Sequence, residues 1–190
     1  EETNAPYGIA KKTLMELLIA YNKQYNFNCT NLIPVNMYGP NDNFDPGKSH
    51  VIPALILKFA KAIRNKESTV ELWGTGSASR EFLYVDDCAS AISQSLEKDT
   101  TPYPINIGTC SEITIKKLAE TLADIMGYEG SVTFNSDYPD GQPRRCLDTS
   151  RAYKVLGFEA KTELYKGLKE TVSWFYKNEG KFVDYFNNIQ

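Results

Sequence analysis

The chain has 190 residues, enough for one large domain, or a domain with a subdomain, around a proper hydrophobic core. With 42% hydrophobic and 24% charged residues the composition is that of a globular protein, and no apolar stretch approaches transmembrane length. The net charge of −3 and the lack of a basic run argue against nucleic acid as a partner.

The first predicted element is a helix over residues 7–25, where apolar side chains recur at helical spacing from Leu14 to Tyr21. Tyr7 and Lys11 lie one turn apart on one face of this helix. A lysine ammonium beside a phenol favours phenolate, so such a pair can transfer a proton near neutral pH. The more frequent case at this common spacing is a half-buried tyrosine beside a solvated lysine.

A short apolar strand is expected over residues 28–35, followed by a turn cluster at 36–40 and a polar loop at 41–48. Loops that follow strands in α/β sheets often carry binding groups. The next helix is expected over residues 50–65, with Ser49 as its cap.

The rest of the chain alternates strands and helices, which predicts an α/β fold. Strands are expected over residues 69–73, 80–85, 104–108 and 131–134. Helices are expected to end at residues 97, 126, 156 and 176, with a short closing helix in the last dozen residues. The candidate caps are Asp86 or Asp87, Ser111 or Thr114, and Asp148, with Gly127 and Gly157 as helix stops. Polar loops are expected at residues 99–102 and 137–145.

His50 is the only histidine and stands at the start of a predicted helix. The positive end of the helix dipole disfavours imidazolium there, so neutral imidazole is available as a base at pH 7. Imidazolium can still form transiently and act as an acid. The alternative is a capping or surface histidine without a catalytic role.

Three arginines fall where a crevice could form, since Arg80 opens a predicted strand and Arg144 and Arg145 lie in a Pro/Gly loop. The guanidinium fork pairs bidentately with phosphate oxygens, as a diphosphate requires. The indole of Trp73 could stack on a purine. The alternatives are solvated arginines and a core tryptophan.

Metal and disulfide chemistry are poorly supported. None of the four cysteines (Cys29, Cys88, Cys110 and Cys146) forms a Cys-x-x-Cys pair or stands next to the histidine. We therefore expect no metal site and a reducing, cytoplasmic setting. The lack of a stretch of transmembrane length predicts no membrane partner. No Gly-x-Gly-x-x-Gly follows a strand, and the Gly-Thr-Gly run at residues 74–76 lies between two strands, so it is not a phosphate loop.

Taken together, several stretches resemble the extended short-chain dehydrogenase/reductase family of NAD-dependent epimerases and dehydratases. They are residues 6–12, 34–44, 49–56, 73–76, 80–87 and 141–145. The resemblance implies that residues 1–40 are the C-terminal part of a Rossmann-type dinucleotide-binding domain. Residues 41–190 would form mainly the smaller sugar-nucleotide domain, with segments that return to the Rossmann part.

The resemblance also implies a role for each matching residue. Tyr7 would donate a proton to the C4 oxygen of a keto-sugar, Lys11 would hold the nicotinamide ribose, and His50 would act in epimerisation at C3 and C5. The contacts implied for NADP are Tyr7, Lys11, Pro34, Val35, Asn36, Met37 and His50. The contacts implied for a GDP-sugar are Lys58, Trp73, Arg80, Arg144 and, more weakly, Lys154. Where the family commonly has arginine, Lys58 keeps the charge but loses the fork.

The implied reaction is the NADPH-dependent conversion of GDP-4-keto-6-deoxy-D-mannose to GDP-L-fucose. Two alternatives stay open: a related enzyme for another sugar such as a GDP-heptose, and a non-catalytic fragment that binds sugar nucleotides. The family has a glycine-rich Rossmann segment before its tyrosine, which this sequence lacks. We therefore expect no reductase activity from the 190-residue chain alone. By analogy with the fold, whose first helix often packs against its mate, we expect a homodimer for the full-length protein.

Overall fold

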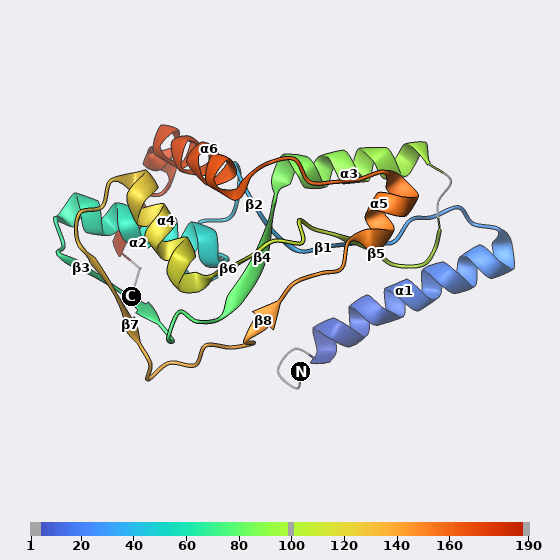
Figure 1. Cartoon of the computed structure of the whole chain (residues 1–190), viewed down its shortest axis with the longest axis horizontal. Helices are drawn as coiled ribbons and strands as arrows, with labels where there is room; N and C mark the ends of the chain where they lie inside the picture. The colour runs from blue at the N-terminus through green and yellow to red at the C-terminus, as the bar shows by residue number, and fades with distance from the viewer. Residues whose placement is uncertain (1–4, 99–100, 188–190) are drawn as a thin grey trace.

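Helices and strands alternate along the chain, which confirms the predicted α/β class (Figure 1). The computed structural model describes residues 5–98 and 101–187. The helices are α1 (Ala5–Tyr25), α2 (Val51–Asn65), α3 (Val85–Glu97), α4 (Ile115–Met126), α5 (Ser150–Leu156) and α6 (Leu164–Lys177), with the 3-10 helices η2 (Glu179–Lys181) and η3 (Val183–Asn187). The strands are β1 (Leu32–Pro34), β2 (Asn36–Tyr38), β3 (Thr69–Trp73), β4 (Ser79–Tyr84), β5 (Ile105–Ile107), β6 (Glu112–Thr114), β7 (Ser131–Asn135) and β8 (Arg144–Arg145).

Strand β4 is the centre of the largest group of paired strands. Its C-terminal half pairs in parallel with β2, and its N-terminal half pairs with β6 in antiparallel and with β8 in parallel orientation. Two separate parallel pairs, β1 with β5 and β3 with β7, complete the strand pairing. Segments far apart in the sequence therefore meet along β4.

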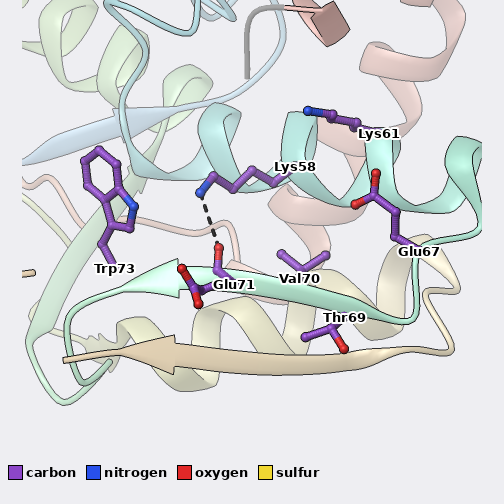
Figure 2. A pocket seen from close by; sticks show the side chains of 7 residues that line it. All are labelled: Lys58, Lys61, Glu67, Thr69, Val70, Glu71 and Trp73. Carbon is purple, nitrogen blue, oxygen red and sulfur yellow. Dashed lines mark hydrogen bonds between the residues drawn. The ribbon is translucent and has the colours of Figure 1, made fainter. Parts of the chain in front are cut away.

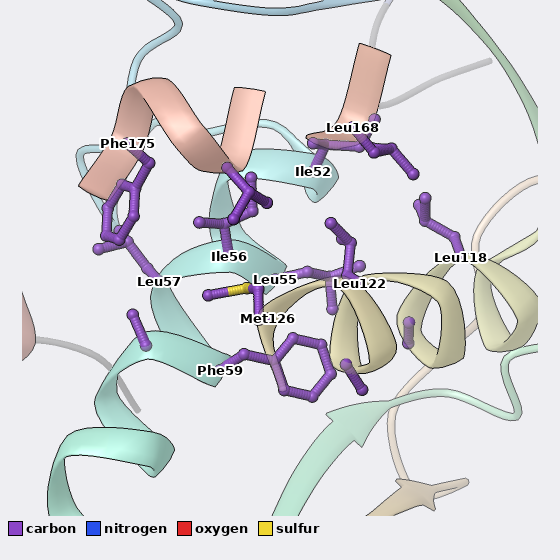
Figure 3. Packing of buried hydrophobic residues seen from close by; sticks show 14 of the residues in the cluster. Ile52, Leu55, Ile56, Leu57, Phe59, Leu118, Leu122, Met126, Leu168 and Phe175 are labelled. Carbon is purple, nitrogen blue, oxygen red and sulfur yellow. The ribbon is translucent and has the colours of Figure 1, made fainter. Parts of the chain in front are cut away.

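The buried apolar side chains form two clusters. The larger one lies among α2, α4 and α6, where Ile56, Leu122 and Phe175 are fully buried (Figure 3). The smaller one joins β5 to α3 and α5 through residues such as Ile107 and Leu156. Burial of this apolar surface is the main force that holds each unit together.

Helix α1 has the predicted extent, but none of its residues is buried. Figure 1 shows it set apart from the other helices along one side of the chain. Leu14, Leu17 and Tyr21 are each about half exposed, so the predicted apolar stripe is not covered by other described residues. The prediction of helical periodicity is confirmed, and the alternative of a half-buried Tyr7 is wrong because its side chain is 67% exposed.

Three cap predictions are wrong, those for helices α2, α3 and α5. His50, not Ser49, is the N-cap residue of α2, and the Ser49 hydroxyl is buried without a hydrogen-bond partner among the described residues. Helix α3 is capped by Tyr84, so Asp86 and Asp87 lie in its first turn instead. Carboxylates are favourable there as well, because they face the positive end of the helix dipole.

Other helix ends follow their local signals. Thr114 caps α4 by accepting the backbone N–H of Lys117 at 3.1 Å, so Ser111 is not the cap. Gly127 and Gly157 close their helices in the left-handed conformation, as predicted. The third wrong cap prediction is Asp148, because Thr149 is the N-cap residue of α5. The Asp148 side chain does accept the N–H of Ser150 at 2.9 Å, from one position before the cap.

Three short strands were missed by sequence reasoning. Residues 36–38, predicted as a turn, form β2, and β6 and β8 lie in segments predicted as a helix start and a loop. Strands of two or three residues carry no readable periodicity, and each depends on a partner distant in sequence. The closing helix is formed by two 3-10 turns, while residues 99–100 of the predicted loop and residues 188–190 lie outside the described part of the chain.

Within residues 5–98 and 101–187, no helix is long and apolar enough to cross a lipid bilayer. The same residues hold no group of three or more histidine, cysteine or acidic side chains arranged for a metal ion. All four cysteines are free thiols.

Candidate active site

A cavity of about 310 Å³, the central cavity, gathers several predicted site residues. Its lining residues are Asn36, Met37, His50, Val51, Ile52, Arg80, Phe82, Ile115 and Asp140. Four of these were predicted from the sequence, and they come from β2, the start of α2 and β4. Pairing of β2 with β4 and packing of α2 beside them bring these distant residues together.

His50 is exposed and also lines a neighbouring cavity of about 290 Å³, together with Asp42. One carboxylate oxygen of Asp42 accepts the N–H of Asn43 at 2.7 Å, while the other is buried without a hydrogen-bond partner among the described atoms. Burial raises the pKa of Asp42, and the nearby His50 partly opposes that change. Asp42 was not singled out from the sequence, and its place in the polar loop before His50 is the only signal.

Arg80 is partly buried and donates from Nη1 to its neighbour's carbonyl, Ser79 O, at 2.7 Å. Burial lowers the pKa of the Arg80 guanidinium, and the charge of Arg145 lowers it further. The β4–β8 register pairs Arg80 with Arg145, and Ser79 with Arg144. Paired residues of neighbouring strands share a face of the sheet and consecutive residues alternate, so Arg145 shares the face of Arg80.

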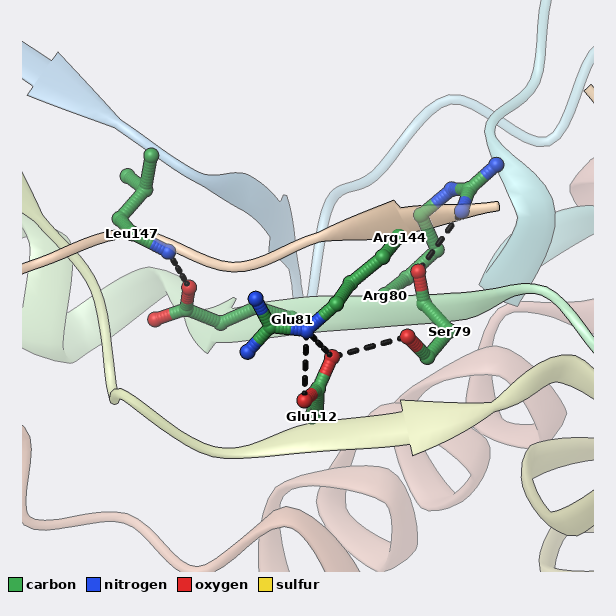
Figure 4. Close-up of polar contacts among 6 residues, drawn as sticks. All are labelled: Ser79, Arg80, Glu81, Glu112, Arg144 and Leu147. Carbon is green, nitrogen blue, oxygen red and sulfur yellow. Dashed lines mark hydrogen bonds and ion pairs between the residues drawn. The ribbon is translucent and has the colours of Figure 1, made fainter. Parts of the chain in front are cut away.

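Arg144, predicted to contact substrate, forms an ion pair instead. Its Nε lies 3.0 Å from both carboxylate oxygens of Glu112 on β6 (Figure 4). The arginine that the structure places beside Arg80 is therefore Arg145. The sequence showed both arginines but held no signal that separated them.

Asp140 reaches the central cavity from the long loop before β8. Its carboxylate accepts the N–H of Thr75 at 2.7 Å and the hydroxyl of Thr75 at 2.6 Å, which lowers the pKa of Asp140. Gly74 has a φ of +80°, and a Cβ there would collide with this carboxylate. The Gly-Thr-Gly turn joins β3 to β4, as predicted. Through Thr75 it also anchors the loop that carries Asp140.

Lys58 and Trp73 meet at a second pocket of about 160 Å³, the Lys58–Trp73 pocket (Figure 2). Lys58 Nζ donates to Glu71 O at 3.3 Å and lies 5.7 Å from the centre of the Trp73 ring. Burial lowers the pKa of Lys58. Trp73 is 58% exposed and stacks on Tyr138 with ring centres 4.6 Å apart, so the core alternative for Trp73 is wrong. Sequence reasoning missed Tyr138.

The other predicted site residues lie outside these two cavities. Lys11 Nζ is 5.5 Å from the centre of the Tyr7 ring, so the two share one face of α1 as predicted. Neither lines the central cavity or the Lys58–Trp73 pocket. Pro34 ends β1, and Val35 donates its N–H to Ile107 O at 2.9 Å. Lys154 lies on the exposed side of α5, near Asp148.

Glu81, beside Arg80, is a fully buried carboxylate that joins three segments. It accepts the backbone N–H groups of Thr109, Cys110 and Leu147 at 2.5–2.8 Å. These bonds connect β4 to the loop before β6 and to the segment after β8. Sequence reasoning placed Glu81 only in a motif and missed this function.

Glu81→Ala is expected to lower the free energy of unfolding by about 3 kcal/mol, because three backbone N–H groups lose a buried charged acceptor and an unsatisfied N–H costs about 1–3 kcal/mol where it is buried. Urea unfolding followed by circular dichroism measures the change. Glu120→Ala is the matched control, since Glu120 is exposed and pairs with Lys117 only at 3.8 Å. Equal stability of the two variants would contradict the structural role.

Three comparisons relate the chain to known proteins. The model of the NAD dependent epimerase/dehydratase family matches residues 1–108. The GDP-L-fucose synthase of Escherichia coli (strain K12) is 42% identical over 191 residues, which cover 96% of this chain and 59% of that protein. The crystal structure of a GDP-L-fucose synthetase from Naegleria fowleri bound to NADP superposes with a TM-score of 0.87 at 29% identity, covering 95% of this chain and 58% of that one.

A GDP-D-glycero-L-gluco-heptose synthase from Campylobacter jejuni, solved in the presence of NADPH, gives a TM-score of 0.79 at 29% identity. The match covers 93% of this chain and 61% of that structure. The chain thus spans less than two thirds of the length of each of these relatives.

Proposed function

The chain belongs to the NAD dependent epimerase/dehydratase family, and on that basis we propose that it carries the sugar-nucleotide site of an NADPH-dependent epimerase/reductase. The proposed reaction converts GDP-4-keto-6-deoxy-D-mannose to GDP-L-fucose. The observation that carries the proposal is the central cavity, where His50 and Arg80 face the same space beside Asn36 and Met37. Because the match covers 59% of the Escherichia coli relative, the complete reaction is proposed for the full-length protein.

The substrate contacts follow from the two cavities. Arg80 is the proposed diphosphate contact in the central cavity, with Arg145 as its neighbour on the same sheet face. Trp73 and Lys58 offer an aromatic face and a charge to the GDP moiety at the Lys58–Trp73 pocket. Arg144 and Lys154 have weaker support, because one is paired with Glu112 and the other lies outside both cavities.

The cofactor contacts proposed for NADP include residues 34–37, which run from the end of β1 into β2. Pro34 and Met37 are exposed, and Met37 lines the central cavity, so these side chains fit the apolar face of a nicotinamide ring. The Asn36 amide donates to Glu81 O at 3.2 Å, which fixes this segment against β4. NADPH, when bound, supplies the hydride for reduction at C4.

The protein's own groups are proposed to move the protons. The 4-keto group acidifies the protons at C3 and C5, and His50 exchanges a proton with these carbons on one face of the sugar ring. Inversion also needs a second acid–base group on the opposite face, because the proton must leave from one side and return from the other. Arg80 holds the diphosphate, so the sugar ring stays beside His50. Tyr7 donates a proton to the C4 oxygen, with Lys11 one helical turn away.

The division of the chain at residue 40, into the end of a dinucleotide-binding domain and a sugar-nucleotide domain, remains a proposal. The smaller apolar cluster, which includes Leu83, Ile105 and Leu156, would belong with the Rossmann part, and the larger cluster with the substrate domain. The uncovered apolar stripe of α1 is a surface on which the proposed homodimer can be tested. The four free thiols suit a reducing, cytoplasmic setting.

Two other functions rest on specific observations. Similarity to the Campylobacter jejuni heptose enzyme favours a GDP-heptose as the second candidate substrate. The position of Tyr7 outside the central cavity favours a chain that binds sugar nucleotides without catalysis. NADPH turnover by the purified 190-residue chain would exclude the non-catalytic function, and parallel assays with both GDP-sugars would separate the substrates.

Arg80→Ala is expected to weaken GDP binding about 10- to 100-fold, since hydrogen bonds to charged groups contribute about 1.5–3 kcal/mol each. Isothermal titration calorimetry with the purified chain measures the affinity. Arg64→Ala is the matched control, because Arg64 is an exposed arginine on α2 that lines neither the central cavity nor the Lys58–Trp73 pocket. Unchanged affinity in Arg80→Ala would remove the diphosphate assignment.

A further inference from the structure

His50 stands between two cavities. It lines the central cavity, where Arg80 and Asp140 also lie, and it lines the neighbouring cavity of about 290 Å³ together with Asp42. Its imidazole has no hydrogen bond to another residue in the described part of the chain. A neutral imidazole has one nitrogen that donates and one that accepts a hydrogen bond, so the ring can serve both cavities at once.

On the side of the central cavity, the two charged neighbours of His50 are poor partners for it. Arg80 is a cation and repels an imidazolium. Both carboxylate oxygens of Asp140 are already held by Thr75, one by its N–H at 2.7 Å and the other by its hydroxyl at 2.6 Å. The better partner for the imidazole is therefore on the side of the neighbouring cavity.

The neighbouring cavity offers the carboxylate of Asp42. One of its oxygens accepts the N–H of Asn43 at 2.7 Å, while Oδ2 is buried without a hydrogen-bond partner among the described atoms. A buried carboxylate oxygen without a partner is unfavourable and calls for an explanation. The other ionisable group there, the Tyr38 hydroxyl, donates to Leu164 O at 3.4 Å instead. An unpaired donor on His50 and an unpaired acceptor on Asp42 thus border the same space.

The loop of residues 39–49 holds Asp42 at a set position. Side chains of this loop accept its own backbone N–H groups at 2.7–2.9 Å, that of Asn43 by Asp42, that of Asp45 by Asn43 and that of Gly47 by Asp45. The ring of Phe44 anchors the loop, since it is buried in the larger apolar cluster. The carboxylate is therefore fixed relative to the start of α2, as a residue that orients a catalytic group must be.

We propose that Asp42 is a positioning residue for His50: its carboxylate accepts a hydrogen bond from one imidazole nitrogen, so that the other nitrogen faces the sugar in the central cavity. When His50 takes a proton from C3 or C5, the electron pair of that C–H bond enters the enolate of the 4-keto sugar, and the carboxylate stabilises the imidazolium. Asp42 itself neither gains nor loses a proton. The proposal rests on the proposed function and deepens it.

NMR of the side-chain carboxyl carbons in the 190-residue chain tests the pairing without any substrate. Burial raises the pKa of Asp42, while the hydrogen bond from Asn43 and the charge of His50 lower it. His50→Gln removes the last of these effects, so the pKa of Asp42 is expected to rise. Lys48→Gln is the matched control, because it removes a positive charge of the same loop that lies 3.8 Å from Asp45. A rise in His50→Gln no larger than in Lys48→Gln would overturn the proposal.

Deuterium exchange at C3 and C5 by the full-length protein tests the consequence. Asp42→Asn keeps an oxygen that can accept the N–H of Asn43 but removes the charge, and it is expected to lower kcat for exchange about 10- to 100-fold. KM is expected to stay within about threefold, because Asp42 does not line the central cavity. Asp45→Asn is the matched control, since Asp45 lies on the same loop and lines neither cavity. A raised KM with an unchanged kcat would indicate a merely structural role and contradict the proposal.

The double variant His50→Gln/Asp42→Asn shows whether Asp42 acts through His50. In that case Asp42→Asn is expected to slow exchange by less than about twofold in the His50→Gln background. A further loss as large as in the wild type would mean that Asp42 acts on the sugar by itself, and the positioning role would be wrong. Absence of exchange in the wild-type full-length protein would overturn the proposed function, whereas the NMR titration would still decide the pairing of Asp42 with His50.

Discussion

Tyr7→Phe is expected to lower C4 reduction by the full-length protein about 10²- to 10⁴-fold, while solvent deuterium still enters C3 and C5 of the sugar. The phenylalanine keeps the ring that lies 5.5 Å from Lys11 Nζ but removes the only proton that this side chain can donate. Epimerisation needs no proton at the C4 oxygen from Tyr7 if His50 works at the carbon centres. The two half-reactions should therefore separate.

NADPH consumption and mass-spectrometric deuterium incorporation measure the two half-reactions in one sample. Tyr21→Phe is the matched control, because Tyr21 lies on the same helix and is 52% exposed. Full reductase activity of Tyr7→Phe would contradict the assignment of Tyr7 as the proton donor. Loss of both half-reactions would instead point to a role in substrate binding.

His50→Gln is expected to slow deuterium incorporation at C3 and C5 about 10²- to 10⁴-fold, because glutamine can hydrogen-bond but cannot take up a proton. His50 is the only histidine of the chain, and in the central cavity it lies with Arg80. Its backbone also forms the N-cap of α2 without a side-chain hydrogen bond, so glutamine should leave the helix start intact.

The exchange rate is measured with the substrate in deuterated buffer, and Tyr7→Phe serves as the variant that keeps exchange. An unchanged melting temperature of His50→Gln shows that the cavity persists. Wild-type exchange in a folded His50→Gln protein would assign epimerisation to another group, with Asp42 as a candidate because it lines the neighbouring cavity together with His50.

Regular elements could be predicted where the information is local. Helix α4 has an apolar period, a threonine cap at Thr114 and a closing glycine at Gly127, and all three signals act within a few residues. Strand β3 alternates buried and exposed side chains over five residues. The strands β2, β6 and β8 could not be predicted, since each exists through pairing with β4.

The candidate site likewise has residues that the local sequence predicts and residues whose contacts only the tertiary structure shows. The residue types at Tyr7, Lys11, His50 and Arg80 and the motifs around them were sufficient to indicate the family, and the chemistry proposed for the site depends on them. The contacts of Tyr138 and Asp140 carry no such pattern, because both residues lie on a loop that returns to the end of β3 and the turn after it, more than sixty residues earlier. Asp42 is only eight residues from His50, but its irregular loop has no periodic signal.

The sequence by itself determined that this protein is an α/β member of its family with a tyrosine–lysine pair on one helix and a single histidine at the start of another. Only the tertiary structure decided which side chains share a cavity, and that Arg145 rather than Arg144 accompanies Arg80. The physical reason is that helical spacing and capping act over a few neighbouring residues. The face on which a strand residue points is set by its register with a partner more than sixty residues away.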